Sequence, residues 1–325
     1  MKALLIEPGG KLRLTDVPLR DLAPGDCRIA VRLAGICRTD LELVKGYMDF
    51  AGIPGHEFVG VVHDGPEHLV GRRVTGEINI ACGTCPACRT GLRRHCPNRS
   101  VLGIYNRNGA FAEFVDLPTE NVLTIPDNVS DEEAVFAEPL AAALEIFEQL
   151  HIPPGSRVLV IGDGKLGLLC AQVCTLLGAR VTLLGRHEKK LALARRWNVE
   201  ALLSADRPSL ENADARFPFV IECSGTPGAL NEALAWTAPR GTLVLKSTYA
   251  PASPPQLDWA KIVIDEISIV GSRCGQLAPA LRLLAGGRVD VRSLIDHRKT
   301  LDQGVEAFDL AARKGALKVL VRIGA

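Results

Sequence analysis

Two patterns of apolar and polar positions divide this sequence. Up to about Val115, short alternating stretches are separated by Gly and Pro, which is typical of β-strands joined by turns. From Gly155 an apolar strand is followed by a turn and a helix, and this alternation predicts a parallel, doubly wound sheet. After Gly271 the pattern is mixed again. We therefore predict a first domain over 1–140, a second over 141–274, and a return to the first over 275–325.

Individual elements can be placed by the same periodicity. The fold class is α/β, with short strands first and strand–helix units later. In the first domain the predicted strands are Lys2–Ile6, Cys27–Leu33, Phe58–Val62, Arg73–Glu77 and Ala112–Val115. Beyond it we predict the strands Arg157–Ile161, Val181–Leu184, Phe219–Glu222 and Lys318–Ile323, and helices that end at Leu177 or span Glu188–Trp197 and Leu277–Ala285.

Charge and hydropathy limit the partners. With 38 basic and 37 acidic residues, the formal charge is +1, so no global field attracts nucleic acid or an anionic membrane. Leu166–Ala179 is the longest apolar stretch, but it is shorter than the roughly 20 residues that span a bilayer. The N-terminus has no signal-peptide pattern. We expect a cytoplasmic protein whose partner is a small molecule, with no nucleic acid and no membrane.

Four of the ten cysteines form one cluster in a turn-rich stretch. Their spacing is C-x2-C-x2-C-x7-C, and four thiolates complete a tetrahedral zinc site with no open position. An iron–sulfur cluster, or cysteines spaced by chance, are the alternatives. We predict a structural zinc ion with the ligands Cys82, Cys85, Cys88 and Cys96.

A second candidate metal site lies earlier in the chain. Cys37 in the segment GICRTD and His56-Glu57 in the segment GHE combine a thiolate, an imidazole and a carboxylate. Three protein ligands leave the fourth position of zinc for water or substrate, as a catalytic site requires. Taken singly, however, such a Cys is usually a small core residue, and a lone His or Glu is usually satisfied by its neighbours or solvated.

A glycine-rich turn follows the strand Arg157–Ile161. It has the form G-x-G-x-x-G and leads into an apolar helix, the context in which this motif binds a dinucleotide. The glycines allow a tight turn, and the helix N-terminus attracts the pyrophosphate. The alternative is an ordinary strand-to-helix turn. The predicted cofactor residues are Gly162, Gly164, Lys165, Leu166 and Gly167.

The end of the second strand of this domain bears on the choice of cofactor. An acid there normally binds the ribose 2′-hydroxyl of NAD, but here the strand ends in Gly185-Arg186. Arg186 can pair with a 2′-phosphate, and Gly185 leaves space where an acid would repel it. We therefore favour NADP over NAD. A solvated Arg186 at a helix start is the alternative.

These motifs together resemble the zinc-containing medium-chain alcohol and polyol dehydrogenases over nearly the whole chain. The resemblance implies a Rossmann domain and a mainly β, GroES-like catalytic domain that carries the zinc lobe. It also implies one catalytic zinc, hydride transfer between an alcohol and nicotinamide, and a homodimer or homotetramer formed through the dinucleotide domains. The motifs are GICRTD, GHE, the four-cysteine lobe, GAFAEF at Gly109–Phe114, AEPLA at Ala137–Ala141 and the glycine-rich turn.

The resemblance implies roles for the residues of the catalytic site. Cys37, His56 and Glu138 match the three zinc ligands, and Glu57 is an adjacent carboxylate that coordinates directly or exchanges with water. A helix N-cap ahead of Pro139 is the alternative for Glu138.

Residues around this site also match roles in the family. Thr39 matches the hydroxyl that takes the proton of the alcohol, Asp40 a carboxylate that orients His56, and Arg38 a pyrophosphate contact. The family's usual relay His is replaced by Glu42, so the proton leaves through Glu42 or water.

The resemblance also places Ser247 and the segment Arg273–Cys274 beside the nicotinamide carboxamide. The sequence does not identify the substrate alcohol or carbonyl compound. A nucleotide-binding zinc protein without turnover, and a zinc hydrolase or lyase, are the alternative functions.

Overall fold

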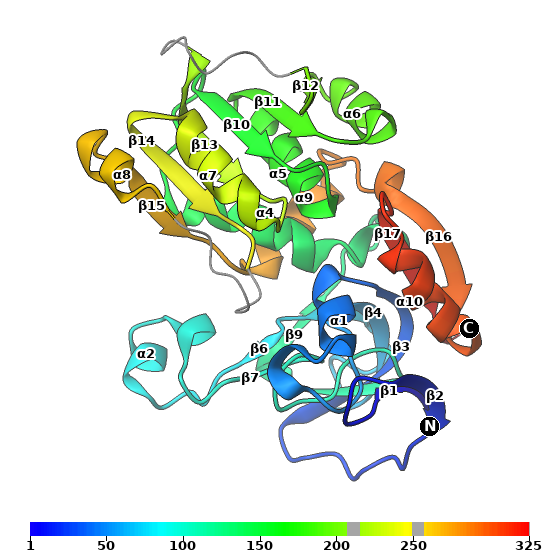
Figure 1. Ribbon diagram of the computed structural model, residues 1–325. Helices are drawn as coiled ribbons and strands as arrows, with labels where there is room; N and C mark the ends of the chain where they lie inside the picture. Colours follow the sequence, from blue (N-terminus) through cyan, green and yellow to red (C-terminus); the bar gives the residue numbers. More distant parts are fainter. Residues whose placement is uncertain (207–214, 249–256, 325) are drawn as a thin grey trace. The chain divides into compact units, whose positions relative to one another are not determined.

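The chain forms two compact units. The computed structural model describes residues 1–206, 215–248 and 257–324 (Figure 1). The first unit comprises Met1–Glu138 and Gln276–Ala325, and the second comprises Pro139–Gly275. In the described part of the chain, no helix is long and apolar enough to cross a membrane.

A seven-stranded sheet forms the core of the first unit. Its order is β16-β17-β3-β4-β5-β9, with β8 also paired to β3. The central strand β3 (Asp26–Gly35) pairs antiparallel with β4 (Glu57–Asp64), β8 (Phe114–Pro118) and β17 (Lys318–Arg322). The last strand of the chain thus lies beside a strand near its start.

One predicted strand of this unit was misplaced. We predicted Ala112–Val115, but β8 begins at Phe114, and Ala112 forms only an isolated bridge to Ala3. The preceding amides of Ala110 and Phe111 donate instead to the carbonyl oxygens of Gly55 and Pro54, 2.9 and 3.1 Å away. This loop is therefore held against the segment that carries His56 rather than against a strand.

The remaining elements of the first unit are the other three strands of this sheet, β5, β9 and β16, and short segments outside it. They are β1 (Lys2–Ile6), β2 (Leu12–Asp16), α1 (Arg38–Val44), η1 (Tyr47–Asp49), β5 (Arg73–Gly76), β6 (Asn79–Ile80), α2 (Pro86–Arg89), η2 (Arg93–His95), β7 (Ser100–Val101), η3 (Thr119–Asn121), β9 (Val122–Thr124), α3 (Asp131–Ala134), α9 (Leu277–Ala285), η5 (Arg292–Leu294), β16 (Ile295–Thr300), η6 (Leu301–Gln303) and α10 (Gly304–Ala312).

The second unit is a six-stranded parallel sheet with helices packed against it (Figure 1). The strand order, β12-β11-β10-β13-β14-β15, is that of the doubly wound dinucleotide fold, so the predicted Rossmann sheet is confirmed. Its elements are α4 (Ala137–Gln149), β10 (Arg157–Ile161), α5 (Lys165–Leu176), β11 (Arg180–Gly185), α6 (Glu188–Arg195), β12 (Glu200–Leu203), β13 (Phe217–Glu222), α7 (Pro227–Trp236), β14 (Thr237–Leu245), α8 (Trp259–Ile264) and β15 (Ser268–Gly271).

The apolar strand β10 explains why this sheet forms. Val158, Leu159, Val160 and Ile161 are all buried, as expected for a parallel strand covered on both faces. Strands β11 and β13 flank β10, so the strand order reverses between β10 and β13. Ligands of such sheets bind at the carboxyl ends of the strands at this point.

Candidate metal and cofactor sites

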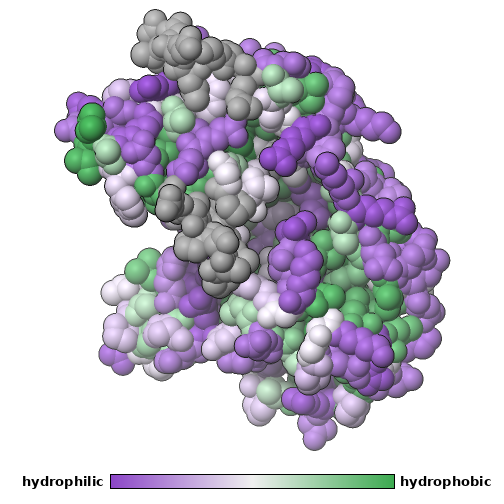
Figure 2. Space-filling view, viewed as in Figure 1, coloured by the Kyte–Doolittle hydropathy of each residue, from purple (hydrophilic) through white to green (hydrophobic). Residues whose placement is uncertain are grey.

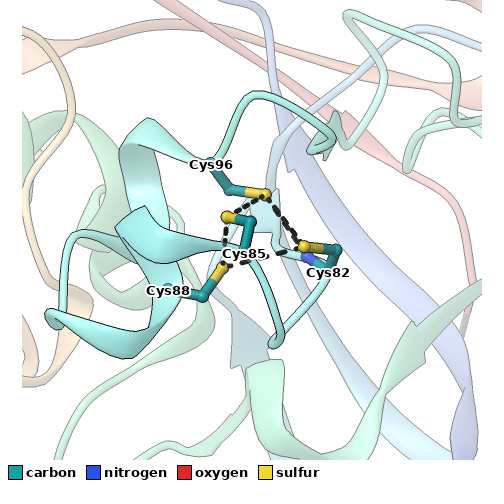
Figure 3. A group of neighbouring side chains, drawn as sticks. All are labelled: Cys82, Cys85, Cys88 and Cys96. Carbon is teal, nitrogen blue, oxygen red and sulfur yellow. Dashed lines mark hydrogen bonds between the residues drawn. The ribbon is translucent and has the colours of Figure 1, made fainter.

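The four clustered cysteines surround a single point. Their Sγ atoms are separated by 3.4 Å (Cys85–Cys88), 3.5 Å (Cys96–Cys82), 3.7 Å (Cys85–Cys96) and 4.0 Å (Cys82–Cys88) (Figure 3). Tetrahedral zinc with Zn–S bonds of about 2.3 Å places its sulfurs about 3.8 Å apart. The cluster therefore fits one tetrahedral ion.

The surroundings of the four sulfurs shift the pKa values of two of them in opposite directions. Cys85 precedes α2, whose first residue is Pro86, and Gly83 has a φ of 75° that disfavours a side chain. The amides of Thr84 and Cys85 lower the pKa of Cys82 to about 5. Burial and the neighbouring thiols instead raise the pKa of Cys88 to about 12. A cation among these sulfurs would favour the thiolate form of all four.

A second group of ligands lies in the first unit. One ligand atom each from Cys37, His56 and Glu57 lies within 4.8 Å of the others. Cys37 precedes α1, while His56 and Glu57 stand where β4 begins, so a helix start and a strand start supply the donors. His56 and Glu57 are buried, and Cys37 is half-buried. This set can hold zinc and leave a position open.

Asp40, in the first turn of α1, lies beside both Cys37 and His56. Its Oδ2 accepts the amide hydrogen of Cys37 at 2.8 Å, and its Oδ1 lies 3.4 Å from Nδ1 of His56. Burial lowers the pKa of His56, but the charges of Asp40 and Cys37 outweigh it and raise that pKa well above 6.5. Asp40 stands at Nδ1, so the other ring nitrogen of His56 remains for a metal.

Other residues predicted for this site occupy separate positions. Glu138 is buried in the first turn of α4, which begins at Ala137, and it is outside the three-residue ligand group. Thr39 has its hydroxyl 3.8 Å from the Cys37 sulfur. Arg38 is exposed and pairs with Glu42 at 2.8 Å, and Glu42 also lies 3.2 Å from Lys45. The roles predicted for Thr39, Glu138, Arg38 and Glu42, like those of the three ligands, stay predictions.

The glycine-rich turn has the steric form that a dinucleotide needs. A Cβ on Gly167 would lie 1.9 Å from the carbonyl oxygen of Gly162, so a side chain there is excluded. A Cβ on Gly164, which precedes α5, would meet no protein atom within 4 Å. The turn is closely packed at Gly162 and Gly167 and open at Gly164, which fits backbone approach by a pyrophosphate.

The comparisons with known proteins agree with this fold and these sites. Residues 23–127 match the family described as alcohol dehydrogenase GroES-like domain, and residues 166–286 match zinc-binding dehydrogenase. An L-threonine 3-dehydrogenase from Mesorhizobium japonicum is 32% identical over 97% of this chain and 96% of its own length. The chain belongs to the zinc-containing medium-chain alcohol dehydrogenases.

Solved structures of the family carry both types of nicotinamide cofactor. A protein described as a zinc-binding dehydrogenase from Sinorhizobium meliloti 1021, bound to NADP, has a TM-score of 0.91 at 30% identity and covers 99% of this chain and 98% of its own. One described as a short chain alcohol dehydrogenase from Escherichia coli CFT073, complexed with NADH, also has a TM-score of 0.91 at 27% identity, with 99% of both chains covered. This dehydrogenase is a zinc-dependent NAD(P) oxidoreductase of alcohol or polyol hydroxyls.

A buried lysine of the dehydrogenase was missed from the sequence. Lys318, at the start of β17, forms an ion pair with Glu57, and both side chains are 1% exposed. A Cβ on Gly35 would lie 2.7 Å from a carboxylate oxygen of Glu57, so Gly35 provides space for this pair. The available signal was a Lys at the head of an apolar strand. Its partner is distant in sequence, so the pattern did not reveal the pair.

A second lysine that was missed from the sequence connects two strand ends of the second unit. Lys246, just beyond β14, donates to the carbonyl oxygens of Ala142 and Arg273 at 2.6 and 2.7 Å and to Oγ of Ser272 at 3.1 Å. These bonds join the ends of β14 and β15 and hold Arg273 near the strand end that precedes Ser247. Ser247 and Arg273, two of the residues predicted to lie beside the nicotinamide, thus each follow by two residues a strand whose end Lys246 joins to the other.

Our prediction of open space beside Gly185 was wrong. We expected open space there, but a Cβ on Gly185 would lie 2.7 Å from Cβ and Oδ2 of Asp163. Asp163 is the second residue of the glycine-rich turn and is buried. The space next to the end of β11 is therefore already filled by the Asp163 side chain, from the glycine-rich turn that follows β10.

Proposed function

We propose that this dehydrogenase oxidises a polyol or amino alcohol with NADP, using a zinc ion at Cys37, His56 and Glu57, with Glu138 as a further ligand. The convergence of the three ligand atoms within 4.8 Å is the observation that carries the proposal. Zinc with an open position acts as a Lewis acid that lowers the pKa of an alcohol. The bound nicotinamide supplies the chemistry of hydride acceptance.

The chain's own residues bind, orient and move protons. The Thr39 hydroxyl, 3.8 Å from the Cys37 sulfur, accepts the proton of the alcohol as it gives up its own to water or Glu42. Asp40 fixes the ring of His56 from the Nδ1 side. Lys318 forms an ion pair with the buried Glu57 side chain and so holds it in place beside Cys37 and His56.

A substrate panel tests this function. L-Threonine is the first compound to try, because a relative covering nearly the whole chain bears the name L-threonine 3-dehydrogenase. Polyols, sugars and short alcohols follow with NAD and NADP, and aldehydes with NADH and NADPH, and the change in absorbance of the reduced nicotinamide is the readout. Absence of any change with every compound would support a nucleotide-binding protein without turnover.

We further propose that the cysteine lobe holds a second, structural zinc, and Cys88→Ser tests it. The variant leaves an incomplete tetrahedron, so we expect loss of about one zinc per chain and a lower melting temperature. Metal analysis and thermal denaturation measure the two effects. Cys174→Ser, a buried cysteine outside both clusters, is the control. Full metal content with an unchanged melting temperature would contradict the assignment.

Arg186 supports the proposed preference for NADP. Its side chain is exposed at the end of β11, where it can bond a 2′-phosphate. Arg186→Ala should weaken NADP by about 1.5–3 kcal/mol and barely change NAD, because only NADP carries the phosphate. Arg196→Ala removes the same charge beyond the other end of α6 and should leave both affinities unchanged. Equal or tighter binding of NAD by the wild type would refute the preference.

Two copies of the chain are proposed to pair through β15 and α8. Within the described residues β15 is the edge strand of its sheet. Trp259 and Val263, one helical turn apart on α8, are 68% and 74% exposed, and Figure 2 shows hydrophobic side chains gathered at this place. A cytoplasmic homodimer, or a homotetramer built from it, would cover them.

Val263→Asp tests this surface. A charge in the centre of an apolar interface should shift the protein from dimer to monomer, as measured by sedimentation. Val70→Asp changes an equally apolar residue, 49% exposed in the first unit, and should leave the assembly intact. An unchanged mass for Val263→Asp would place the interface elsewhere.

A further inference from the structure

The Asp163 carboxylate holds the segment that follows β11. Its Oδ2 accepts the backbone amide hydrogens of Arg186 at 2.8 Å and His187 at 2.7 Å. Asp163 itself belongs to the glycine-rich turn after β10. One side chain thus joins the turn for the pyrophosphate to the segment that carries Arg186.

The imidazole of His187 completes this arrangement. Its Nδ1 lies 3.0 Å from Oδ2 of Asp163. Burial would raise the pKa of Asp163, but the amides of His187 and Arg186, the His187 ring and the charge of Lys190 together lower it. The carboxylate is therefore ionised at neutral pH, and its charge is compensated by donors that surround it.

The Asp163 side chain can occupy its place only because residue 185 is a glycine. A Cβ at position 185 would lie 2.7 Å from the Asp163 side chain and 2.8 Å from Cδ2 of Leu191. An acid at the end of β11, the usual partner of the ribose 2′-hydroxyl, is excluded while Asp163 keeps this place. Gly185→Asp would displace Asp163 and would not simply add an acceptor for NAD.

We propose that Asp163 is a specificity-determining residue for a cofactor with a 2′-phosphate. It acts as a positioning residue: by fixing the backbone of Arg186 and His187, it holds the exposed Arg186 side chain where the phosphate binds. Its own charge is engaged by two amides and an imidazole, so it does not repel the phosphate. The inference rests on the proposed preference for NADP.

Calorimetric titration of the full chain with two cofactor fragments tests this role without turnover. The probes are adenosine 2′,5′-bisphosphate and adenosine 5′-monophosphate, which differ only in the 2′-phosphate. Asp163→Ala removes the acceptor for both amides, so we expect about tenfold weaker bisphosphate binding or more, with the monophosphate changed by less than about twofold. Asp163→Asn keeps an oxygen for the amides and should retain most of the bisphosphate affinity.

Two further variants test whether Asp163 acts by positioning Arg186 or only through its charge or its contribution to stability. Glu188→Ala removes a neighbouring exposed acid that pairs with Arg195, and it should leave both affinities unchanged. The double variant Asp163→Ala/Arg186→Ala should bind the bisphosphate no more weakly than Arg186→Ala alone, because Asp163 acts through Arg186.

Each other result overturns the proposal in a recognisable way. Equal weakening of both fragments, with a lower melting temperature, would mean that Asp163 only supports folding of the turn. Selective weakening of the monophosphate would mean that Asp163 itself binds the ribose hydroxyls, and unchanged affinities would remove it from the site. Wild-type protein that does not favour the bisphosphate refutes the NADP preference. A wild type that favours it, with an unaffected Asp163→Ala, refutes only the role of Asp163.

Discussion

Cys37→Ser should abolish hydride transfer while leaving the fold and the cysteine lobe intact. A serine hydroxyl is a poor zinc ligand beside His56 and Glu57, so the metal is lost from the open site. Lewis-acid stabilisation amounts to several kcal/mol, and each 1.36 kcal/mol is a factor of ten, so kcat/KM should fall by about 1,000-fold or more. Steady-state kinetics with metal analysis measures both losses.

A matched control and a chelation experiment sharpen this prediction. Cys27→Ser changes a buried cysteine outside both metal groups, with Thr119 as its neighbour at 3.4 Å, and should keep full activity and zinc. A brief exposure to chelator should remove the zinc of the open site before that of the four-sulfur site. Fully active protein with only one zinc per chain would refute the two-site assignment.

Lys318→Met should destabilise the first unit by about 3–5 kcal/mol, the largest stability change we expect. Once the zinc of the open site has been removed, the substitution leaves the Glu57 carboxylate buried without a cation. Because all three tryptophans lie in the second unit, at Trp197, Trp236 and Trp259, their fluorescence does not report on this change. Denaturation followed by circular dichroism is the suitable measurement.

The loss of stability should depend on whether the remaining partner of the broken ion pair is charged and buried. In the same zinc-depleted protein, removing both charges in Glu57→Gln/Lys318→Met should restore most of the stability, since no unpaired charge is left. Lys299→Met, on neighbouring β16, breaks a pair with Glu306 of α10, and because Glu306 is 54% exposed, the loss should stay below about 1 kcal/mol. If Lys318→Met lowers the free energy of unfolding by less than about 1 kcal/mol as well, then water must reach the Glu57 carboxylate.

Local patterns were enough to predict the architecture. The strand Arg157–Ile161 and the helix Leu277–Ala285 have the limits predicted for them, because strong periodicity and flanking glycines mark both. The fold class and the family followed from the motifs and are confirmed. Very short strands such as β6 and β7 were missed because two residues carry no periodicity.

The side-chain contacts around the metal and cofactor sites could not be predicted from the sequence. The Lys318–Glu57 pair depends on β17 and β4 lying on either side of β3, which no local pattern encodes. Similarly, Asp163 meets Arg186 and His187 because β10 and β11 are parallel neighbours whose ends coincide. Sequence spacing identified Gly185 as unusual but not the side chain that fills its space.

The position of β15 along the chain has a consequence for synthesis. Because a nascent chain emerges from its N-terminus, the exposed edge at Ser268–Gly271 appears before β17, which adds to the first unit's sheet. An unpaired strand edge is a template for association with any other strand. Neighbouring chains on one messenger could therefore join through β15 while their first units are incomplete. Slow translation after residue 271 would lengthen the interval in which β15 edges can pair before the first unit's sheet is complete.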